Sequence, residues 1–267
     1  MKNIIEIKNL SFSYDEDREI LSNITMLIPA GKITAIMGGS GSGKTTILKL
    51  ISGQLRPSAG TLQVFDKMIS GISAKNLAEI RKKMGVLFQF GALFTDLNIS
   101  DNIAFPILEH TKLPKEIIDI IVALKLESVG LSGTQNLMPD KLSGGMARRI
   151  ALARAMAMDP QLMLYDEPFT GLDPISLSTI AMLIKTMNTN LKQTSVIVSH
   201  DISKTFEIAD YVYFMSNGKI IAHGTTEEIK NTSNAAVKQF INGAVNGPFA
   251  YKYPSTKSYQ EYLGINN

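Results

Sequence analysis

The stretch Gly38-Gly39-Ser40-Gly41-Ser42-Gly43-Lys44-Thr45-Thr46 decides the fold of this chain. It matches the pattern G-x-x-x-x-G-K-[ST], which is typical of a phosphate-binding loop (P-loop). A β-branched, apolar strand pattern over 32–37 precedes it, and a helical pattern over 46–51 follows it. Backbone N–H groups in such a strand-to-helix turn can surround an anion, and the helix N-terminus adds partial positive charge. The sequence therefore predicts a site for a nucleoside triphosphate.

Two side chains of this loop have specific expected roles. Lys44 is expected to reach the β- and γ-phosphates, and the Thr45 hydroxyl to hold Mg²⁺. The other loop residues are expected to line the phosphates with their backbone: Gly38, Gly39, Ser40, Gly41, Ser42, Gly43 and Thr46. A glycine- and serine-rich turn that binds nothing is the alternative, and the flanking strand and helix argue against it.

Composition excludes several classes of protein. The chain has 267 residues, enough for one large domain or two small ones, and its net charge of +3 is too small to indicate a nucleic-acid partner. It has no cysteine, which excludes disulfides, thiol catalysis and thiolate metal sites. The N-terminus lacks signal-peptide features, and no apolar run approaches the roughly 18 residues that span a membrane. We therefore expect a cytoplasmic protein.

Tyr14 ends the first strand pattern, which covers 4–14 and precedes a polar turn and a second strand pattern over 20–29. An aromatic ring at this place can stack on a nucleobase. It can equally be an ordinary strand residue, and the spacing does not decide between the two.

Polar residues follow three further strand patterns. Gln89 follows 84–88, where it can coordinate Mg²⁺ and contact the γ-phosphate or simply face solvent. Asp166 and Glu167 end a buried strand; Asp166 is expected to hold Mg²⁺ and Glu167 to polarise the attacking water. His200 follows 194–199 and can hydrogen-bond the γ-phosphate. The carboxyl ends of parallel strands lie at the same edge of a sheet. We therefore expect the side chains that follow these strands to lie near the P-loop, which follows a strand of the same sheet.

A second candidate anion site lies at the start of a helical run, at Ser143, Gly144 and Gly145. One nucleotide does not need two such sites in one chain, so this one is expected to close over the γ-phosphate of a nucleotide held by a second chain. The arginines of this helix are expected to form a solvated or phosphate-side face: Arg148, Arg149 and Arg154. Asp173 either crosses a dimer interface or caps the helix that starts near Ile175.

Two apolar or aromatic stretches lack an obvious place. The segment 90–94, Phe-Gly-Ala-Leu-Phe, is either buried core or a groove for a partner. The C-terminal stretch 242–267 holds four of the eight tyrosines, so we expect it to pack on its own domain or on a neighbouring subunit.

Taken in order and spacing, these motifs resemble the ATP-binding subunits of ABC transporters over roughly 4–240. The Leu-Ser-Gly-Gly element at 142–145 separates that family from other P-loop proteins. The resemblance implies an α/β fold: a RecA-like P-loop NTPase core (about 1–89 and 158–241) with an antiparallel β subdomain and an inserted α-helical signature subdomain (about 90–157). Gly39 departs from the proline frequent at that place, which should leave the loop intact.

The same resemblance implies how the site works. Two chains would form a head-to-tail dimer with two ATPs between the P-loop of one and Ser143–Gly145 of the other. Tyr14 would stack on adenine, Gln89 would link to a membrane partner, Glu167 would be the catalytic base, and His200 the γ-phosphate switch.

Within the family, residues 87–96, 109–114, 142–155 and 166–169 and the C-terminal stretch are similar to ATPases of the Mla phospholipid transport system. That similarity implies a permease subunit, an MCE-domain lipid-binding subunit, a STAS-domain regulatory subunit, and a place on the cytoplasmic face of the inner membrane. It implies that 242–267 reaches a neighbouring subunit, and it favours the groove over the core for 90–94.

Three alternatives remain in the sequence. The ATPase of another ABC importer or exporter would share every catalytic residue. A soluble ABC ATPase is disfavoured because the chain has one P-loop and no sustained heptad pattern. A P-loop kinase would leave 142–146 without a role.

Overall fold

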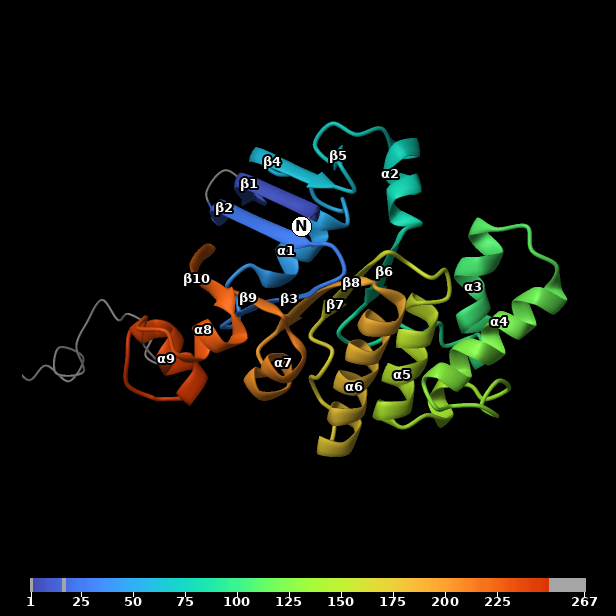
Figure 1. Cartoon of the computed structure of the whole chain (residues 1–267). Coiled ribbons are helices and arrows are strands. Elements are labelled where there is room, and N and C mark those ends of the chain that lie inside the picture. Colours follow the sequence, from blue (N-terminus) through green and yellow to red (C-terminus); the bar gives the residue numbers. More distant parts are fainter. Residues whose placement is uncertain (1, 16–17, 250–267) are drawn as a thin grey trace, which may run out of the picture.

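The computed structural model describes residues 2–15 and 18–249, and it contains two β-sheets. The smaller sheet is antiparallel, with the order β2-β1-β4-β5 (Figure 1). Its strands are β1 (Asn3–Ser13), β2 (Glu19–Pro29), β4 (Ala59–Val64) and the short β5 (Lys67–Met68), which the sequence did not indicate.

The larger sheet has the order β10-β9-β3-β8-β7-β6 and is parallel except for β10, which pairs antiparallel with β9. Its strands are β3 (Ile33–Gly38), β6 (Met84–Leu87), β7 (Leu162–Asp166), β8 (Thr194–Ser199), β9 (Tyr211–Ser216) and β10 (Lys219–Thr225). The P-loop strand β3 lies between β8 and β9, so the P-loop leaves the middle of the sheet. The predicted α/β fold with a separate antiparallel sheet is confirmed.

Side chains on the two faces of the large sheet belong to two different hydrophobic cores. Ile36, Leu164 and Val198 face helix α1 (Lys44–Ile51) and the antiparallel sheet. Met37, Tyr165 and Ile197 face the other side, which is covered by α5 (Gly144–Ala155), α6 (Pro174–Leu191) and α7 (Ile202–Ile208) (Figure 1). The larger sheet is therefore buried on both faces, as its near-continuous apolar strands require.

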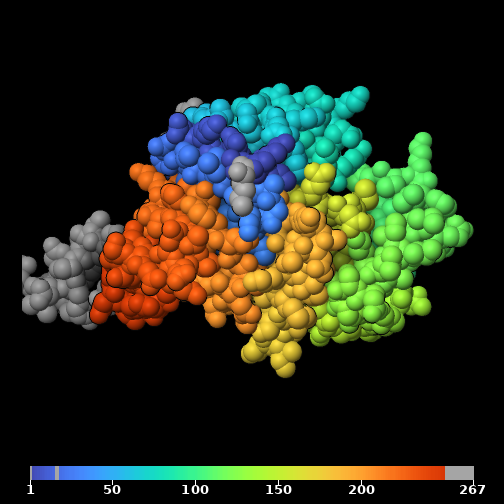
Figure 2. All heavy atoms as spheres, viewed as in Figure 1, coloured from blue at the N-terminus to red at the C-terminus, as the bar shows by residue number. Residues whose placement is uncertain are grey.

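The remaining helices lie at the two ends of the molecule. Helices α3 (Ile99–His110) and α4 (Lys115–Ser128) project at one end, and α8 (Thr226–Lys230) and α9 (Ala235–Asn242) lie at the other (Figures 1 and 2). Helix α2 (Ala74–Arg81) follows the small sheet, and a 3₁₀ turn, η1 (Pro139–Lys141), precedes α5. None of the helices in 2–15 and 18–249 is both long enough and apolar enough to cross a membrane. The division into core, helical subdomain and C-terminal extension stays a prediction.

Gln239 holds the chain that follows α9. Its buried side-chain amide donates to the carbonyl oxygens of Ala244 and Phe249, and its carbonyl oxygen accepts from the Phe249 N–H (2.7 Å). Residues 243–249 are thus folded against α9. The rest of the C-terminal stretch, for which packing on a neighbour was predicted, lies outside the described residues, with all four of its tyrosines.

Asn102 fixes the loop between β6 and α3. Its side chain is fully buried, and its Nδ2 donates to the carbonyl oxygens of Phe94, Leu97 and Asn98, each at 3.0 Å. Its Oδ1 accepts from the Phe94 N–H at 2.9 Å. One amide therefore satisfies the backbone of a loop that has no regular secondary structure.

We expect Asn102→Ala to lower the free energy of unfolding by about 2–4 kcal/mol, because it leaves several buried backbone groups without partners. Urea unfolding measures the change. Asn76→Ala on the exposed side of α2 is the control, and it should change stability by less than about 0.5 kcal/mol. Equal effects of the two substitutions would contradict the role given to Asn102.

Candidate nucleotide-binding site

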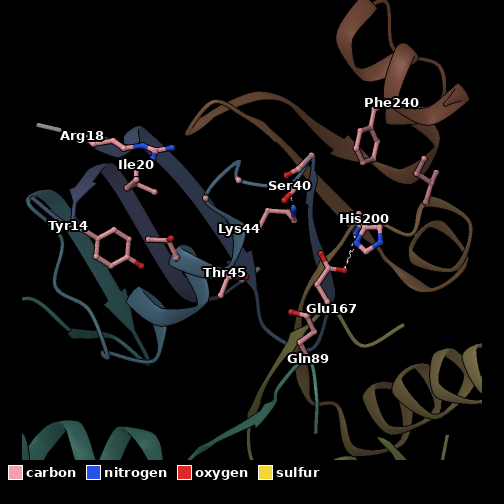
Figure 3. Close-up of a pocket in the computed structure, with 15 residues that line it drawn as sticks. Tyr14, Arg18, Ile20, Ser40, Lys44, Thr45, Gln89, Glu167, His200 and Phe240 are labelled. Carbon is pink, nitrogen blue, oxygen red and sulfur yellow. Dashed lines mark hydrogen bonds and ion pairs between the residues drawn. The ribbon is translucent and has the colours of Figure 1, made fainter. Parts of the chain in front are cut away.

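A cavity of about 870 Å³ lies where the parallel strands end (Figure 3). The P-loop supplies much of its wall: Gly39, Ser40, Gly41, Gly43, Lys44, Thr45 and Thr46. Tyr14, Gln89, Glu167 and His200 also line it, so the structure brings these predicted residues together. Four lining residues were not predicted: Arg18, Ile20, Ile202 and Phe240.

Some of the unpredicted lining residues have a sequence feature from which their position could have been predicted, and others have none. Arg18 lies close to Tyr14 in the sequence, so a cation near a candidate base-stacking ring was a usable signal. Ile202 lies in α7, which begins after Asp201, whose side chain accepts from the Lys204 N–H and marks a helix start. Phe240 reaches the cavity from α9, far along the chain, and no local pattern indicates this.

The P-loop backbone requires glycine at its two ends. Gly38 has φ +146°, and a Cβ there would lie 2.2 Å from the Met215 carbonyl oxygen. Gly43 has φ +97° and is the N-cap of α1, and a Cβ there would lie 2.5 Å from Leu21 Cδ2. Helix α1 begins without a capping side chain and without an acidic residue in its first turn. The Ser42 hydroxyl is buried and has no hydrogen-bond partner in the described part of the chain. The loop thus offers uncommitted donors and positive potential to an anion.

Lys44 is held over this loop. Its Nζ donates to the carbonyl oxygens of Gly38 and Gly39, both at 2.9 Å. Burial lowers the pKa of Lys44, an effect that the carboxylates of Glu167 and Asp166 oppose. A buried ammonium with only neutral acceptors is well placed to take a phosphate oxygen as a stronger partner.

The oxygen atoms suited to a hard cation lie beside Lys44. Thr45 Oγ1 donates to Asp166 Oδ1 at 3.0 Å, and Gln89 lines the same cavity. Burial raises the pKa of Asp166, although the Thr45 hydrogen bond works against the rise. Residues 2–15 and 18–249 contain no group of three or more His, Asp or Glu that could hold a metal alone. Hydroxyl, carboxylate and amide oxygens fit Mg²⁺, which keeps few protein ligands and is held largely by phosphates.

Glu167 follows β7 in a conformation that is uncommon for a residue other than glycine, with φ +49°. Its Oε2 contacts His200 Nδ1 at 2.8 Å and accepts weaker hydrogen bonds from the His200 N–H (3.3 Å) and Thr170 Oγ1 (3.4 Å). The Glu167 side chain is 12% exposed, whereas that of His200 is 57% exposed. This pair can orient a water molecule and accept its proton.

Ser143, Gly144 and Asp173 lie elsewhere, on exposed helix starts. Ser143 caps α5 by accepting from the Met146 N–H, and Asp173 caps α6 by accepting from the Ile175 and Ser176 N–H groups. Among the described residues that line the cavity, none comes from 143–145 or is Asp173. The capping role of Asp173 is therefore confirmed, and its predicted role across a dimer interface stays a prediction.

The expectation that the arginines of α5 form a solvated or phosphate-side face was wrong. Arg148 is buried and donates to the carbonyl oxygens of Phe88 and Thr170. Arg154 donates to the Gly91 carbonyl oxygen, and Arg149 to that of Val129. All three bind the backbone of other segments.

The segment 88–94 presents aromatic side chains to solvent. Phe90 is 89% exposed, so the interpretation of this residue as core is wrong. Phe94 and Phe105 pack with ring centroids 4.6 Å apart and are each partly exposed. We call Phe88, Phe90, Phe94 and Phe105 the aromatic patch.

Fold and site together define a P-loop nucleoside triphosphatase. Residues 21–170 match the family model described as ABC transporter, and this chain belongs to that family. As a family member it binds ATP with Mg²⁺ and hydrolyses ATP.

Three proteins illustrate the similarity of this chain to known sequences and structures. The chain is 52% identical to the Intermembrane phospholipid transport system ATP-binding protein MlaF of Haemophilus influenzae, over 98% of this chain and 97% of that protein. Among solved structures, cbiO1 of Clostridium perfringens, part of the ABC transporter complex cbiONQ, has a TM-score of 0.81 and 30% identity, covering 92% of this chain and 96% of that one. The dimeric post-hydrolysis state of the ATP-binding cassette MJ0796, bound to ADP and Pi, has a TM-score of 0.77 and 28% identity, covering 83% and 98%.

The raised pKa of Asp166 predicts that the charge of this carboxylate destabilises the folded protein when no ligand is bound. An acid whose pKa is higher in the folded than in the unfolded chain destabilises the fold at neutral pH, and this penalty fades as the pH falls through the folded pKa toward the unfolded value near 3.8. Asp166→Asn keeps the acceptor for Thr45 and removes the charge. We expect the variant to melt at a higher temperature than the wild type at pH 7 without Mg²⁺ and nucleotide, with a gain that shrinks at lower pH.

Asp119→Asn, on the exposed side of α4, is the control and should show no such pattern. An Asp166→Asn variant that is less stable than the wild type at pH 7 would contradict the electrostatic account.

Proposed function

We propose that this chain is the ATP-hydrolysing subunit of an ABC transporter that moves phospholipids between the inner membrane and a periplasmic carrier, and so maintains outer-membrane lipid asymmetry. The observation that carries the proposal is the 52% identity, over nearly the whole of both chains, with a protein named for intermembrane phospholipid transport.

Each predicted site residue has a role in the proposed reaction. The P-loop backbone from Gly38 to Thr46 surrounds the phosphates, and Lys44 moves from the loop carbonyls to the β- and γ-phosphates. Mg²⁺, held by Thr45, Asp166 and Gln89, would neutralise charge on the phosphates. Support for this set comes from the Thr45–Asp166 hydrogen bond and the position of Gln89 on the same cavity.

Glu167 is the proposed general base, and His200 the residue that senses the γ-phosphate. Their 2.8 Å contact supports the pairing, because a γ-phosphate that attracts the exposed imidazole would free the carboxylate to bind water. Tyr14 is the proposed adenine-stacking residue. Its ring is 57% exposed and stands at the opposite side of the cavity from His200, about where a base would lie if the phosphates occupied the P-loop (Figure 3).

The active form is proposed to be a head-to-tail homodimer. Ser143 and Gly144 are exposed and lie outside the chain's own cavity, and they open a helix without an acidic residue in its first turn. This is the arrangement expected of an element that binds the γ-phosphate of a nucleotide on a second chain. Asp173 would lie at the same interface. The dimeric solved structures of MJ0796 support the assembly.

The proposed complex adds a membrane permease, an MCE-domain lipid-binding subunit and a STAS-domain regulatory subunit at the cytoplasmic face of the inner membrane. The aromatic patch, two of whose residues flank Gln89, supports a permease contact, because exposed aromatic side chains favour burial against a partner. The C-terminal stretch 242–267 is proposed to reach a neighbouring subunit.

We expect Glu167→Gln to retain ATP binding and abolish steady-state hydrolysis, because the amide cannot accept the proton of the attacking water. The variant should accumulate as an ATP-bound dimer on size-exclusion chromatography with Mg²⁺ and ATP. Glu116→Gln, on the exposed side of α4, should hydrolyse ATP at the wild-type rate. Robust turnover by the Glu167→Gln protein would remove Glu167 from the role of base.

The partners are tested by tagging the chain in its native host, solubilising membranes gently and identifying what co-purifies. We expect a permease together with an MCE-domain and a STAS-domain protein. A permease with a soluble solute-binding protein would keep the ATPase chemistry and reject phospholipid transport. Recovery without any membrane protein would reject a transport role.

A further inference from the structure

Arg148 joins three segments through one buried side chain. It lies in α5, just over one turn beyond Ser143, and is 7% exposed. Its Nη1 donates to the Phe88 carbonyl oxygen at 2.9 Å, and its Nη2 donates to the Thr170 carbonyl oxygen at 3.1 Å. No ion pair of Arg148 with an acidic residue occurs among residues 2–15 and 18–249. A buried cation satisfied by two backbone carbonyls fixes the relative positions of those carbonyls.

Both carbonyls belong to segments that reach the chain's own nucleotide site. Phe88 immediately precedes Gln89, which lines the cavity. Thr170 lies on the turn after β7, and its hydroxyl contacts Glu167 Oε2 at 3.4 Å. The same turn continues to Asp173, the cap of α6. A displacement of Arg148 would therefore move the backbone beside Gln89 and the partner of Glu167 together.

Helix α5 holds the 88–94 segment at a second point. Arg154 Nη2 donates to the Gly91 carbonyl oxygen at 2.8 Å, and its guanidinium lies over the Phe94 ring, 5.3 Å from the centroid. Gly91 also lies against the helix, since a Cβ there would be 3.2 Å from Ala151 Cβ. The segment 88–94 is thus held to α5 at three residues: Phe88, Gly91 and Phe94.

In the proposed dimer, the start of α5 contacts the nucleotide bound by the partner chain, not the nucleotide in the chain's own cavity. Ser143 and Gly144 do not line the chain's own cavity, whereas Arg148, further along α5, binds the carbonyl of Phe88, whose neighbour Gln89 does line it. We propose that Arg148 is a positioning residue that couples the two ATP sites of the dimer: it transmits the position of Ser143–Gly145, set by the partner's nucleotide, to Gln89 and Glu167 at the chain's own nucleotide. This inference rests on the proposed dimeric ATPase.

The side chain must be arginine for this role. The planar guanidinium presents two N–H groups in a fixed fork and so spans two carbonyls at once. Lysine keeps the charge and most of the length, but its single ammonium cannot hold both carbonyls in the same geometry. Arg148→Lys therefore tests the link with little change in charge, and Arg148→Gln removes the charge as well.

The test uses the full chain in the complex that co-purifies with it, reconstituted in lipid, with ATP as the probe. We expect both Arg148 variants to lose about tenfold or more in kcat while the affinity for a non-hydrolysable ATP analogue changes less than about twofold. We expect a Hill coefficient for ATP above 1 in the wild type and a value of about 1 in both variants, and a wild-type value of 1 would also overturn the inference. A residue that only supported the fold would lower analogue binding and the melting temperature together and would leave cooperativity in the folded fraction.

Arg149→Lys is the matched control. Arg149 is the next residue of α5, but it donates to the Val129 and Gly130 carbonyl oxygens, which directly follow α4 and do not line the cavity. The Arg149→Lys variant should keep the wild-type kcat and Hill coefficient. If Arg148→Gln lowers the melting temperature, its loss of activity could come from unfolding, and only the kcat and Hill coefficient of Arg148→Lys are then used to judge the inference.

The inference is overturned if Arg148→Lys keeps both the wild-type kcat and the wild-type Hill coefficient, or if Arg149→Lys loses cooperativity to the same extent. Failure of the proposed function looks different, because the complex that co-purifies with the wild-type chain would then lack the MCE-domain and STAS-domain subunits while it still hydrolysed ATP.

Discussion

The backbone turn between β3 and α1 is the constraint on which the rest of the site depends. Gly38 and Gly43 adopt backbone conformations that residues with a side chain rarely adopt, and a Cβ at Gly38 would collide with the Met215 backbone, so this turn depends on glycine. Strand β3 lies between β8 and β9, and its register with β8 pairs Met37 with Ser199. His200 is therefore delivered next to the loop by strand pairing alone, as is Glu167 by the pairing of β7 with β8.

Charge in this site is arranged for a ligand rather than for stability. Burial shifts the pKa of Lys44 downward and that of Asp166 upward, so each charged form is disfavoured where it stands. Lys44 is satisfied by loop carbonyls and Asp166 by one hydroxyl, which are weak partners for full charges. Phosphates and a divalent cation would offset both penalties at once, which is the physical reason for this donor set to bind magnesium–ATP.

Local features of the sequence predicted most of the fold and the centre of the site. The P-loop, Asp166, Glu167 and His200 follow strands whose order in the sheet is set by ordinary α/β rules, so their meeting could be anticipated. Arg148 could not be assigned, because its acceptors lie 60 and 22 residues away and are backbone carbonyls that leave no mark in sequence. Phe240 was missed for the same reason: its place depends on how α9 packs, not on a motif.

In the proposed dimer, two copies of the chain share each nucleotide site, because the cavity of one copy is lined by its P-loop but not by Ser143–Gly145. The chain has no cysteine, so introduced thiols have no background. The direct measurement places Ser40→Cys in one population and Ser143→Cys in another, mixes them, and follows cross-linking with and without ATP in a Glu167→Gln background. We expect a mixed cross-linked dimer that forms only with ATP and Mg²⁺. Absence of that product, with both variants folded and binding ATP, would contradict it.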